Sequence, residues 1–242
     1  MKLSSDPFFD VPRRPFALSN GQSIDLPVLY IDCSNLGMWF LVDLEKAQSM
    51  LPEPYIAVPS EQGSAMAHVG LYEYRETSLG PYNEGATGIL CVHPDNLEES
   101  GIMIIDLPVT TETARQTGVD VWGYPKFVCD IEMVFDGSKV ESTLTDSDGK
   151  VIMKVNGDRG ISIPAPASDL LTFAHSPHAE GKRPGFVEIR NPYHVSTGAE
   201  ITLSVGDSTH RMANNLRALG LDGKSPDVVM YTNQFQSRLD LI

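Results

Sequence analysis

Cysteine is scarce in this chain of 242 residues, which contains only Cys33, Cys91 and Cys129. Their wide spacing gives no Cys-x-x-Cys pair and no even-numbered disulfide framework. Each cysteine lies in or beside an apolar run, which is typical of buried thiols in a reducing compartment. We therefore expect free, buried cysteines.

Positive charge is also scarce, since 18 lysines and arginines stand against 32 acidic residues and the formal net charge is −14. Such a surface repels phosphate backbones and anionic lipids. No apolar window reaches the length of a membrane span, and the Pro- and Asp-rich start has no apolar segment of the secretory kind. We expect a cytoplasmic protein with no nucleic acid partner and no membrane partner.

The sequence lacks the compact motifs of several enzyme classes. No GxGxxG follows a strand and no GxxxxGK[ST] occurs, so a nucleotide-phosphate cradle is not indicated. None of the six histidines lies in an HExxH motif, and there is no GxSxG elbow. His175 and His178 are close in sequence, but Glu180 is the only carboxylate near them, which argues against a metal site. We expect no metal and no other cofactor.

Apolar runs of strand length outnumber the segments with helical periodicity. Asp136-Gly137 and Asp148-Gly149 are hairpin signals that join three of these runs into an antiparallel meander. So many strands would leave exposed edges unless the sheet closed, and no linker marks a domain boundary. We therefore expect a mainly β, β-rich α+β fold: one domain over residues 1–242, closed into a twisted antiparallel barrel or cone, with residues 1–25 as an N-terminal arm. The main strand-length runs are residues 26–32, 36–42, 65–74, 86–92, 101–109, 127–136, 140–144, 151–155, 186–189, 201–205 and 228–231.

Three short helices are expected between these strands. Asp43 caps the first, Thr110 or Thr111 begins a second that Gly118 would end, and Ser208 or Thr209 begins the third. Residues 80–85 have the composition of a turn. Residues 157–183 contain proline, serine and histidine, and we expect them to form a loop across the surface or over a pocket.

One lysine is distinguished by its surroundings. Lys126 follows Trp122-Gly123-Tyr124-Pro125, and the nearest cations in sequence are Arg115 and Lys139. Burial disfavours the charged form of a lysine, and a free amine can attack a ketone to form a Schiff base. The alternative is a surface lysine whose stem packs on Trp122 while its ammonium reaches water. Local sequence alone favours this alternative, because lysine is seldom buried.

Four short segments of this chain resemble segments of a known family. Trp122-Gly123-Tyr124-Pro125-Lys126 is similar to the lysine motif of acetoacetate decarboxylases and their relatives, and Leu79-Gly80-Pro81-Tyr82-Asn83-Glu84-Gly85 resembles their Gly-x-Tyr-x-Glu segment. Leu51-Pro52-Glu53-Pro54 resembles the Pro-Glu-Pro that ends the first helix of the family. Met230-Tyr231-Thr232 resembles the closing strand. The resemblance covers roughly residues 51–232 and favours the Schiff-base interpretation of Lys126.

This resemblance implies a conical antiparallel barrel around a buried apolar pocket. Lys126 would form the Schiff base with a keto acid, and Glu84 would transfer protons at the carbon beside the imine. Tyr82 and Trp122 are further candidates for contact with the substrate. Beside the resemblance, Arg75 is a candidate to hold the substrate carboxylate; the alternative is a solvated arginine, which is more common in a charged turn.

The chain departs from the family pattern at three cationic positions. Phe127 stands where the decarboxylases carry a second lysine, and Gly118-Val119-Asp120 stands where they have Gly-Arg-Glu. The arginine expected near Asp32-Cys33-Ser34 has no clear match. The resemblance implies a lyase acting on a small-molecule keto acid, most simply a decarboxylase of a β-keto acid such as acetoacetate. The alternatives are an aldolase-dehydratase that condenses pyruvate with an aldehyde, and a non-catalytic barrel that binds an apolar ligand. We also expect a homo-oligomer.

Overall fold

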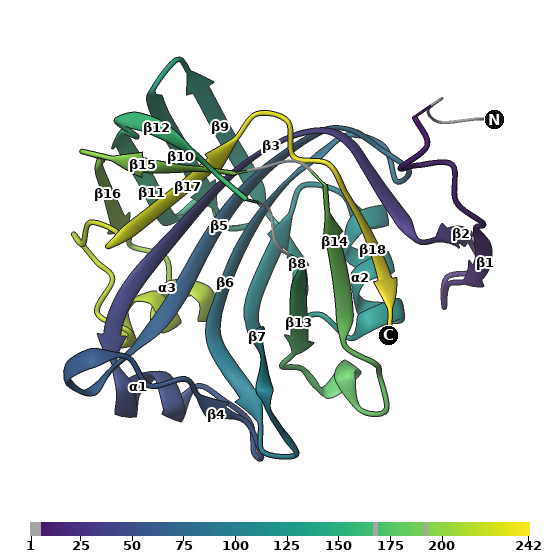
Figure 1. Ribbon diagram of the computed structural model, residues 1–242, viewed down its shortest axis with the longest axis horizontal. Helices are drawn as coiled ribbons and strands as arrows, with labels where there is room; N and C mark the ends of the chain where they lie inside the picture. The colour runs from purple at the N-terminus through teal and green to yellow at the C-terminus, as the bar shows by residue number, and fades with distance from the viewer. Residues whose placement is uncertain (1–5, 167–168, 191–192) are drawn as a thin grey trace.

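The computed structural model describes residues 6–166, 169–190 and 193–242, which form a mainly β structure (Figure 1). The helices are α1 (Leu44–Ser49), α2 (Glu112–Trp122) and α3 (Arg211–Ala218), with short 3-10 turns at Glu61–Gly63 and Pro177–Ala179. The strands are β1 (Arg14–Ala17), β2 (Ser23–Leu26), β3 (Val28–Asp43), β4 (Ile56–Ala57), β5 (Ser64–Thr77), β6 (Tyr82–His93), β7 (Asn96–Val109), β8 (Lys126–Val128), β9 (Asp130–Asp136), β10 (Lys139–Thr145), β11 (Val151–Asp158), β12 (Ile161–Ala165), β13 (Leu170–Ala174), β14 (Gly185–Ile189), β15 (Tyr193–Thr197), β16 (Glu200–Val205), β17 (Val228–Thr232) and β18 (Ser237–Leu241).

Seven strands pair in a closed ring in the order β3, β5, β6, β7, β13, β14 and β18, and β18 pairs back to β3. The mainly β fold is confirmed, with one exception to its antiparallel order. Strand β7 runs parallel to both β13 and β8. The chain passes from β7 through α2 to β8, and such a helical crossover returns a strand in the parallel direction.

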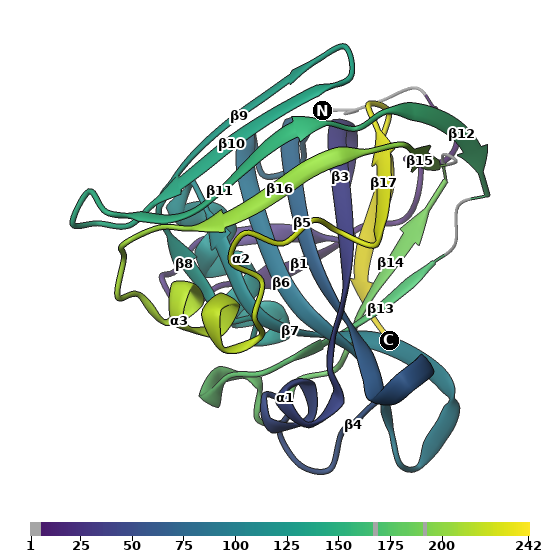
Figure 2. The same ribbon diagram turned by 90° about the vertical axis from the view of Figure 1, so that its left-hand side faces the viewer.

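A second sheet covers the outer face of this ring (Figure 2). Its order is β16, β11, β10 and β9, and it contains the two hairpins predicted at Asp136-Gly137 and Asp148-Gly149. Leu36, Met38 and Phe40 of β3 share a buried cluster with Leu144 and Val155 of this sheet. Because side chains alternate between the two faces of a strand, the residues between them on β3 face the inside of the ring.

Two strand predictions were wrong because long-range pairing decides strand limits. Residues 26–32 and 36–42 belong mostly to one strand, β3, whose pairing with β5 shifts register between Tyr30 and Cys33. The segment 157–183, expected as a loop, contains β12 and β13, which pair with the distant strands β15 and β7. The expected turn at residues 80–85 ends at Pro81, because Tyr82 already pairs with Tyr74 in the sheet.

The helices also differ from the expectation at their ends. Asp43 caps α1 as predicted, since its carboxylate accepts a hydrogen bond from the amide of Lys46 at 2.9 Å. Helix α2 does not end at Gly118 but continues to Trp122, where Gly123 takes the left-handed conformation (φ 72°) that closes a helix. Helix α3 begins at Arg211, and His210 supplies its side-chain cap.

Of the expected N-terminal arm, residues 1–5 lie outside the described residues, and β1 and β2 form a hairpin that docks on α2, where the Ser19 amide donates to the Asp120 carboxylate at 2.8 Å. The three cysteines are buried and free. Among the helices of the described residues, none has the length and apolar character needed to span a membrane.

Candidate active site

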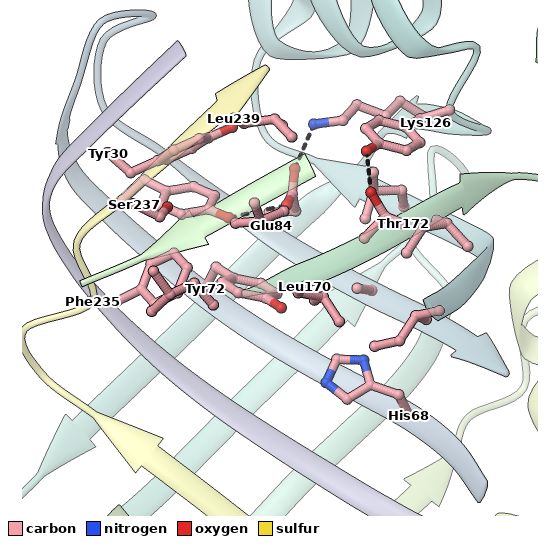
Figure 3. A pocket seen from close by; sticks show the side chains of 18 residues that line it. Tyr30, His68, Tyr72, Glu84, Lys126, Leu170, Thr172, Phe235, Ser237 and Leu239 are labelled. Atoms are coloured by element: carbon pink, nitrogen blue, oxygen red, sulfur yellow. Dashed lines mark hydrogen bonds and ion pairs between the residues drawn. The ribbon is translucent and has the colours of Figure 1, made fainter. Parts of the chain in front are cut away.

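Lys126 and Glu84 meet inside the ring (Figure 3). Lys126 Nζ lies 2.5 Å from Glu84 Oε2, and the two side chains are only 6% and 8% exposed. The Tyr74 hydroxyl donates to the other oxygen of Glu84 at 3.1 Å. Buried charges in proteins are paired, because an isolated charge is costly to remove from water. The contact is therefore an ion pair in which each buried group is the partner of the other.

Strand pairing positions both groups. Lys126 is the first residue of β8 and pairs with Leu107 of β7, while Glu84 lies on β6 opposite Tyr72 of β5. Helix α2 packs on the lysine stem at Gly118, where an added Cβ would lie 2.5 Å from both Cδ and Cε of Lys126. Gly118 thus leaves room for the stem.

Gly118→Ala is expected to displace the Lys126 amine while the fold persists. Alanine favours a helix over glycine by about 1 kcal/mol, so the helix tolerates the change, but the lysine stem must move. A misplacement of about 1 Å can cost on the order of 10²-fold in rate. The measurement is the rate at which an amine-specific reagent labels Lys126, with Thr113→Ala on the exposed side of α2 as the control. A native rate in Gly118→Ala would contradict the packing role of α2.

The Lys126–Glu84 pair opens onto a cavity of about 80 Å³. One water needs about 10–15 Å³ of such space, so the cavity has room for a small organic molecule. Lys126 is the only lysine or arginine among the described lining residues, and most of the others are apolar or aromatic. The lining consists of Tyr30, His68, Tyr72, Tyr74, Glu84, Ala86, Ile102, Ile104, Leu107, Tyr124, Lys126, Leu170, Thr172, Val187, Ile189, Phe235, Ser237 and Leu239.

The lining tyrosines keep their hydroxyl protons. Burial raises the pKa of Tyr30, Tyr72 and Tyr74 above the usual value, and the nearby Glu84 carboxylate raises each further. Burial likewise raises the pKa of Tyr124. These phenols are therefore neutral hydrogen-bonding groups around the amine.

Tyr124 is held in place by a chain of hydrogen bonds. Its hydroxyl lies 2.5 Å from Thr172 Oγ1, and the Thr172 hydroxyl donates to the carbonyl oxygen of Gly185 at 3.0 Å. Because Thr172 uses its single proton on Gly185, Tyr124 donates to Thr172. This chain anchors the wall beside Lys126 to β13 and β14.

The other residues named from the sequence lie outside the cavity lining. Tyr82 is buried, with its hydroxyl 3.3 Å from that of Tyr30 and its ring centroid 5.7 Å from Lys126 Nζ. Trp122 stacks on Tyr124 with ring centroids 5.6 Å apart, and its indole nitrogen donates to the carbonyl of Asp240. Both therefore support the wall of the site from behind.

Arg75 forms ion pairs with two acidic neighbours. Its guanidinium contacts the carboxylates of Asp32 at 2.7 Å and Glu73 at 2.6 Å, and it also donates to the Ser34 hydroxyl. The hydrogen bonds with Asp32 raise the pKa of Arg75. Its charge is thus matched locally, outside the cavity.

Sequence reasoning missed His68, Tyr30 and Thr172 as lining residues. One signal for His68 was present, because His68, Tyr72 and Tyr74 alternate along β5 and so share a face. Tyr30 and Thr172 carried no comparable signal, since their strands reach the cavity only through the ring. Within the described part of the chain, no three His, Cys, Asp or Glu side chains gather as a metal site would need.

Acidification is expected to destabilise the protein through His68. Burial lowers its pKa from 6.5 to about 4. Between these values the unfolded chain binds a proton that the folded chain does not, so stability falls as the pH drops from 6.5 toward 4. With about 1.4 kcal/mol per pH unit, the loss is at most roughly 3 kcal/mol. Urea unfolding near neutral pH and near the acidic limit should show a smaller loss in His68→Phe than in the native protein. Equal losses would contradict the assignment.

Most of this chain matches a known protein family. The family model described as acetoacetate decarboxylase (ADC) matches residues 13–204. The chain belongs to the acetoacetate decarboxylase family. The sequence resemblance is therefore confirmed, and the match includes both Glu84 and Lys126. No curated protein matches the sequence.

Solved structures of the acetoacetate decarboxylase fold are similar over nearly the whole chain. Acetoacetate decarboxylase from Legionella pneumophila is 14% identical, with a TM-score of 0.66 over 98% of this chain and 90% of that one. An acetoacetate decarboxylase-like enzyme from Sphingomonas wittichii is 19% identical, with a TM-score of 0.64 over 93% and 95%. The enduracididine biosynthesis enzyme MppR, complexed with pyruvate, is 14% identical, with a TM-score of 0.61 over 95% of this chain and 96% of that one. At these identities the likeness shows the shared fold.

Proposed function

We propose that this family member is a lyase that forms a Schiff base between Lys126 and a keto acid and releases carbon dioxide from it. The proposal is carried by the buried 2.5 Å contact between Lys126 Nζ and Glu84 Oε2 in an otherwise largely apolar cavity. A proton that passes from Nζ to Oε2 leaves a free amine beside a neutral carboxylic acid. The same pair thus supplies the nucleophile and a proton donor.

The reaction follows from these two groups. The amine of Lys126 attacks the ketone carbon, and loss of water gives an iminium ion. The iminium accepts the electron pair of the bond to the carboxylate, so carbon dioxide leaves and an enamine remains. Glu84 donates a proton to the enamine carbon, and water then hydrolyses the new iminium to release the ketone and the amine.

Decarboxylation is favoured over condensation by the charge of the cavity. Among the described lining residues no second lysine or arginine is present to neutralise a substrate carboxylate beside Glu84. The buried hydroxyl of Ser237 has no partner among the described residues and can bind this carboxylate without neutralising it. A buried, unneutralised anion is costly, and its departure as neutral carbon dioxide removes that cost.

Condensation of pyruvate with an aldehyde is the second candidate. It is supported by the MppR relative, which was also solved with the condensation product of pyruvate and imidazole 4-carboxaldehyde. An enzyme of this kind keeps the pyruvate carboxylate throughout and needs a lasting partner for it.

Product analysis separates these candidates. In the first assay the protein is incubated with acetoacetate, and the carbon dioxide and acetone released are measured. In the second it is incubated with pyruvate and imidazole 4-carboxaldehyde, and the products are analysed by mass spectrometry. Carbon dioxide release supports the lyase, and a new carbon–carbon bond supports condensation. Borohydride reduction with each keto acid, followed by peptide mapping, should place the adduct on Lys126. Neither product nor adduct would favour a non-catalytic barrel.

Several expectations from the sequence stay predictions. Substrate contact by Tyr82, Trp122 or Arg75 would require the substrate to reach beyond the present lining. The homo-oligomer is tested by light scattering during size-exclusion chromatography, and the cytoplasmic location by fractionation of cells that produce the protein.

A further inference from the structure

A second cavity adjoins the cavity beside Lys126 and Glu84, at the end farthest from the Lys126 amine. It has a volume of about 100 Å³ and is bounded by Asn35, Gly37, Trp39, Pro166 and Met230. Figure 3 places His68 and Leu170 at this end, far from the Lys126 amine. The two cavities share a wall made of His68, Tyr72, Ile102, Leu170 and Ile189.

Of two paired glycines near this cavity, Gly37 leaves the space open. Gly37 of β3 lies opposite Gly70 of β5, and Met230 of β17 lies on the other side of Gly37. The rings of His68 and Tyr72 fill the space at Gly70, where an added Cβ would lie 2.8 Å from each. At Gly37 an added Cβ would meet no atom closer than His68 Nε2 at 3.5 Å. The sheet therefore leaves an opening at Gly37 beside the imidazole.

His68 supplies a polar group in the shared wall. The side chain is 94% buried, and its Nδ1 has no hydrogen-bond partner among the described residues. Its ring lies against Trp39, with centroids 4.7 Å apart. A neutral imidazole offers one donor and one acceptor, and a buried polar atom without a partner costs about 1–3 kcal/mol. A hydroxyl group, which both donates and accepts, matches either tautomer of His68.

We propose that the cavity at Gly37 and Trp39 is a second subsite, and that the natural substrate is a keto acid longer than acetoacetate. Its chain carries an uncharged hydroxyl that hydrogen-bonds His68, and its end is apolar or aromatic and packs against Trp39 and Met230. Aromatic and thioether side chains favour such an end. The inference rests on the proposed function, because the keto group of this substrate is held at Lys126.

Gly37→Ala tests the subsite by adding a methyl group to the second cavity alone. Borohydride trapping on Lys126 is measured with acetoacetate, with a long alkyl β-keto acid, and with the same long acid carrying a hydroxyl on its chain. The concentration of long acid that gives half-maximal trapping should rise by about tenfold, as expected for a lost apolar contact of about 1–3 kcal/mol. The value for acetoacetate should stay within about twofold of native. Leu41→Ala, on β3 but outside both cavities, is the control.

His68→Phe tests the hydrogen bond, because phenylalanine keeps a flat ring without nitrogen atoms. The native protein should prefer the hydroxylated long acid over the plain one by about tenfold, and His68→Phe should lose that preference. An unchanged preference in His68→Phe, or an equal effect of Gly37→Ala on short and long acids, would overturn the proposal.

Calorimetric titration of the hydroxylated acid separates this inference from the proposed function. Weaker binding to Gly37→Ala and His68→Phe without any adduct on Lys126 would retain the subsite and reject the Schiff base. Native affinity in both variants would reject the subsite whatever the trapping shows.

Discussion

Lys126→Met should abolish both turnover and borohydride trapping. The amine is the only group in the described lining that can form an imine, and methionine keeps an unbranched stem of similar length without it. Loss of the covalent route should remove most of the acceleration, which in enzymes is at least about 10⁶-fold. The measurement is carbon dioxide release from acetoacetate together with mass mapping of the trapped peptide.

Two further variants show whether that loss comes from the missing amine or from a loss of stability. Lys139→Met, at the exposed start of β10, should keep native turnover. Removing one partner of a buried ion pair destabilises a protein by about 3–5 kcal/mol, so Lys126→Met combined with Glu84→Gln should recover part of the stability lost in urea unfolding. Turnover in a folded Lys126→Met, or an adduct on another lysine, would refute the role of Lys126.

Glu84→Gln should separate imine formation from proton transfer. Glutamine retains the shape of the side chain and an oxygen that can accept from Tyr74, but it cannot carry a proton between atoms. We expect trapping on Lys126 to persist while turnover falls by about 10²–10⁴-fold, the usual contribution of general acid–base catalysis. Deuterium exchange at the carbon beside the ketone should fall in parallel.

The matched control for this change is Glu45→Gln on the exposed side of α1, which should behave as native. Exchange at the native rate in Glu84→Gln would show that another group carries the proton, and the Tyr74 hydroxyl, 3.1 Å from Glu84, would be the next to test.

Phe127, which stands at the position of the decarboxylases' second lysine, packs on the outer side of β8. Phe127 follows Lys126 in β8, and successive strand residues point to opposite faces. Phe127 packs against the outer core, and its ring centroid lies 4.3 Å from that of His210. A residue at this position contributes to packing on the far side of the strand, while Lys126 faces the cavity.

Local sequence by itself determined the features that depend on neighbouring residues. The two Asp-Gly hairpins and the Asp43 cap follow from turn and capping chemistry. Lys126 and Glu84 were named from short motifs, each of which lies on one continuous stretch of chain, and their catalytic roles stay predictions.

Tertiary structure alone decided how these stretches meet. It brought Lys126 and Glu84, 42 positions apart, to 2.5 Å, and it surrounded Arg75 with acidic partners outside the cavity. It also buried His68 beside an opening at Gly37 and turned the expected loop at 157–183 into strands. The physical reason is that strand pairing and burial depend on contacts between segments far apart in sequence. The intrinsic preference of a short segment for strand or loop does not depend on those contacts and cannot predict them.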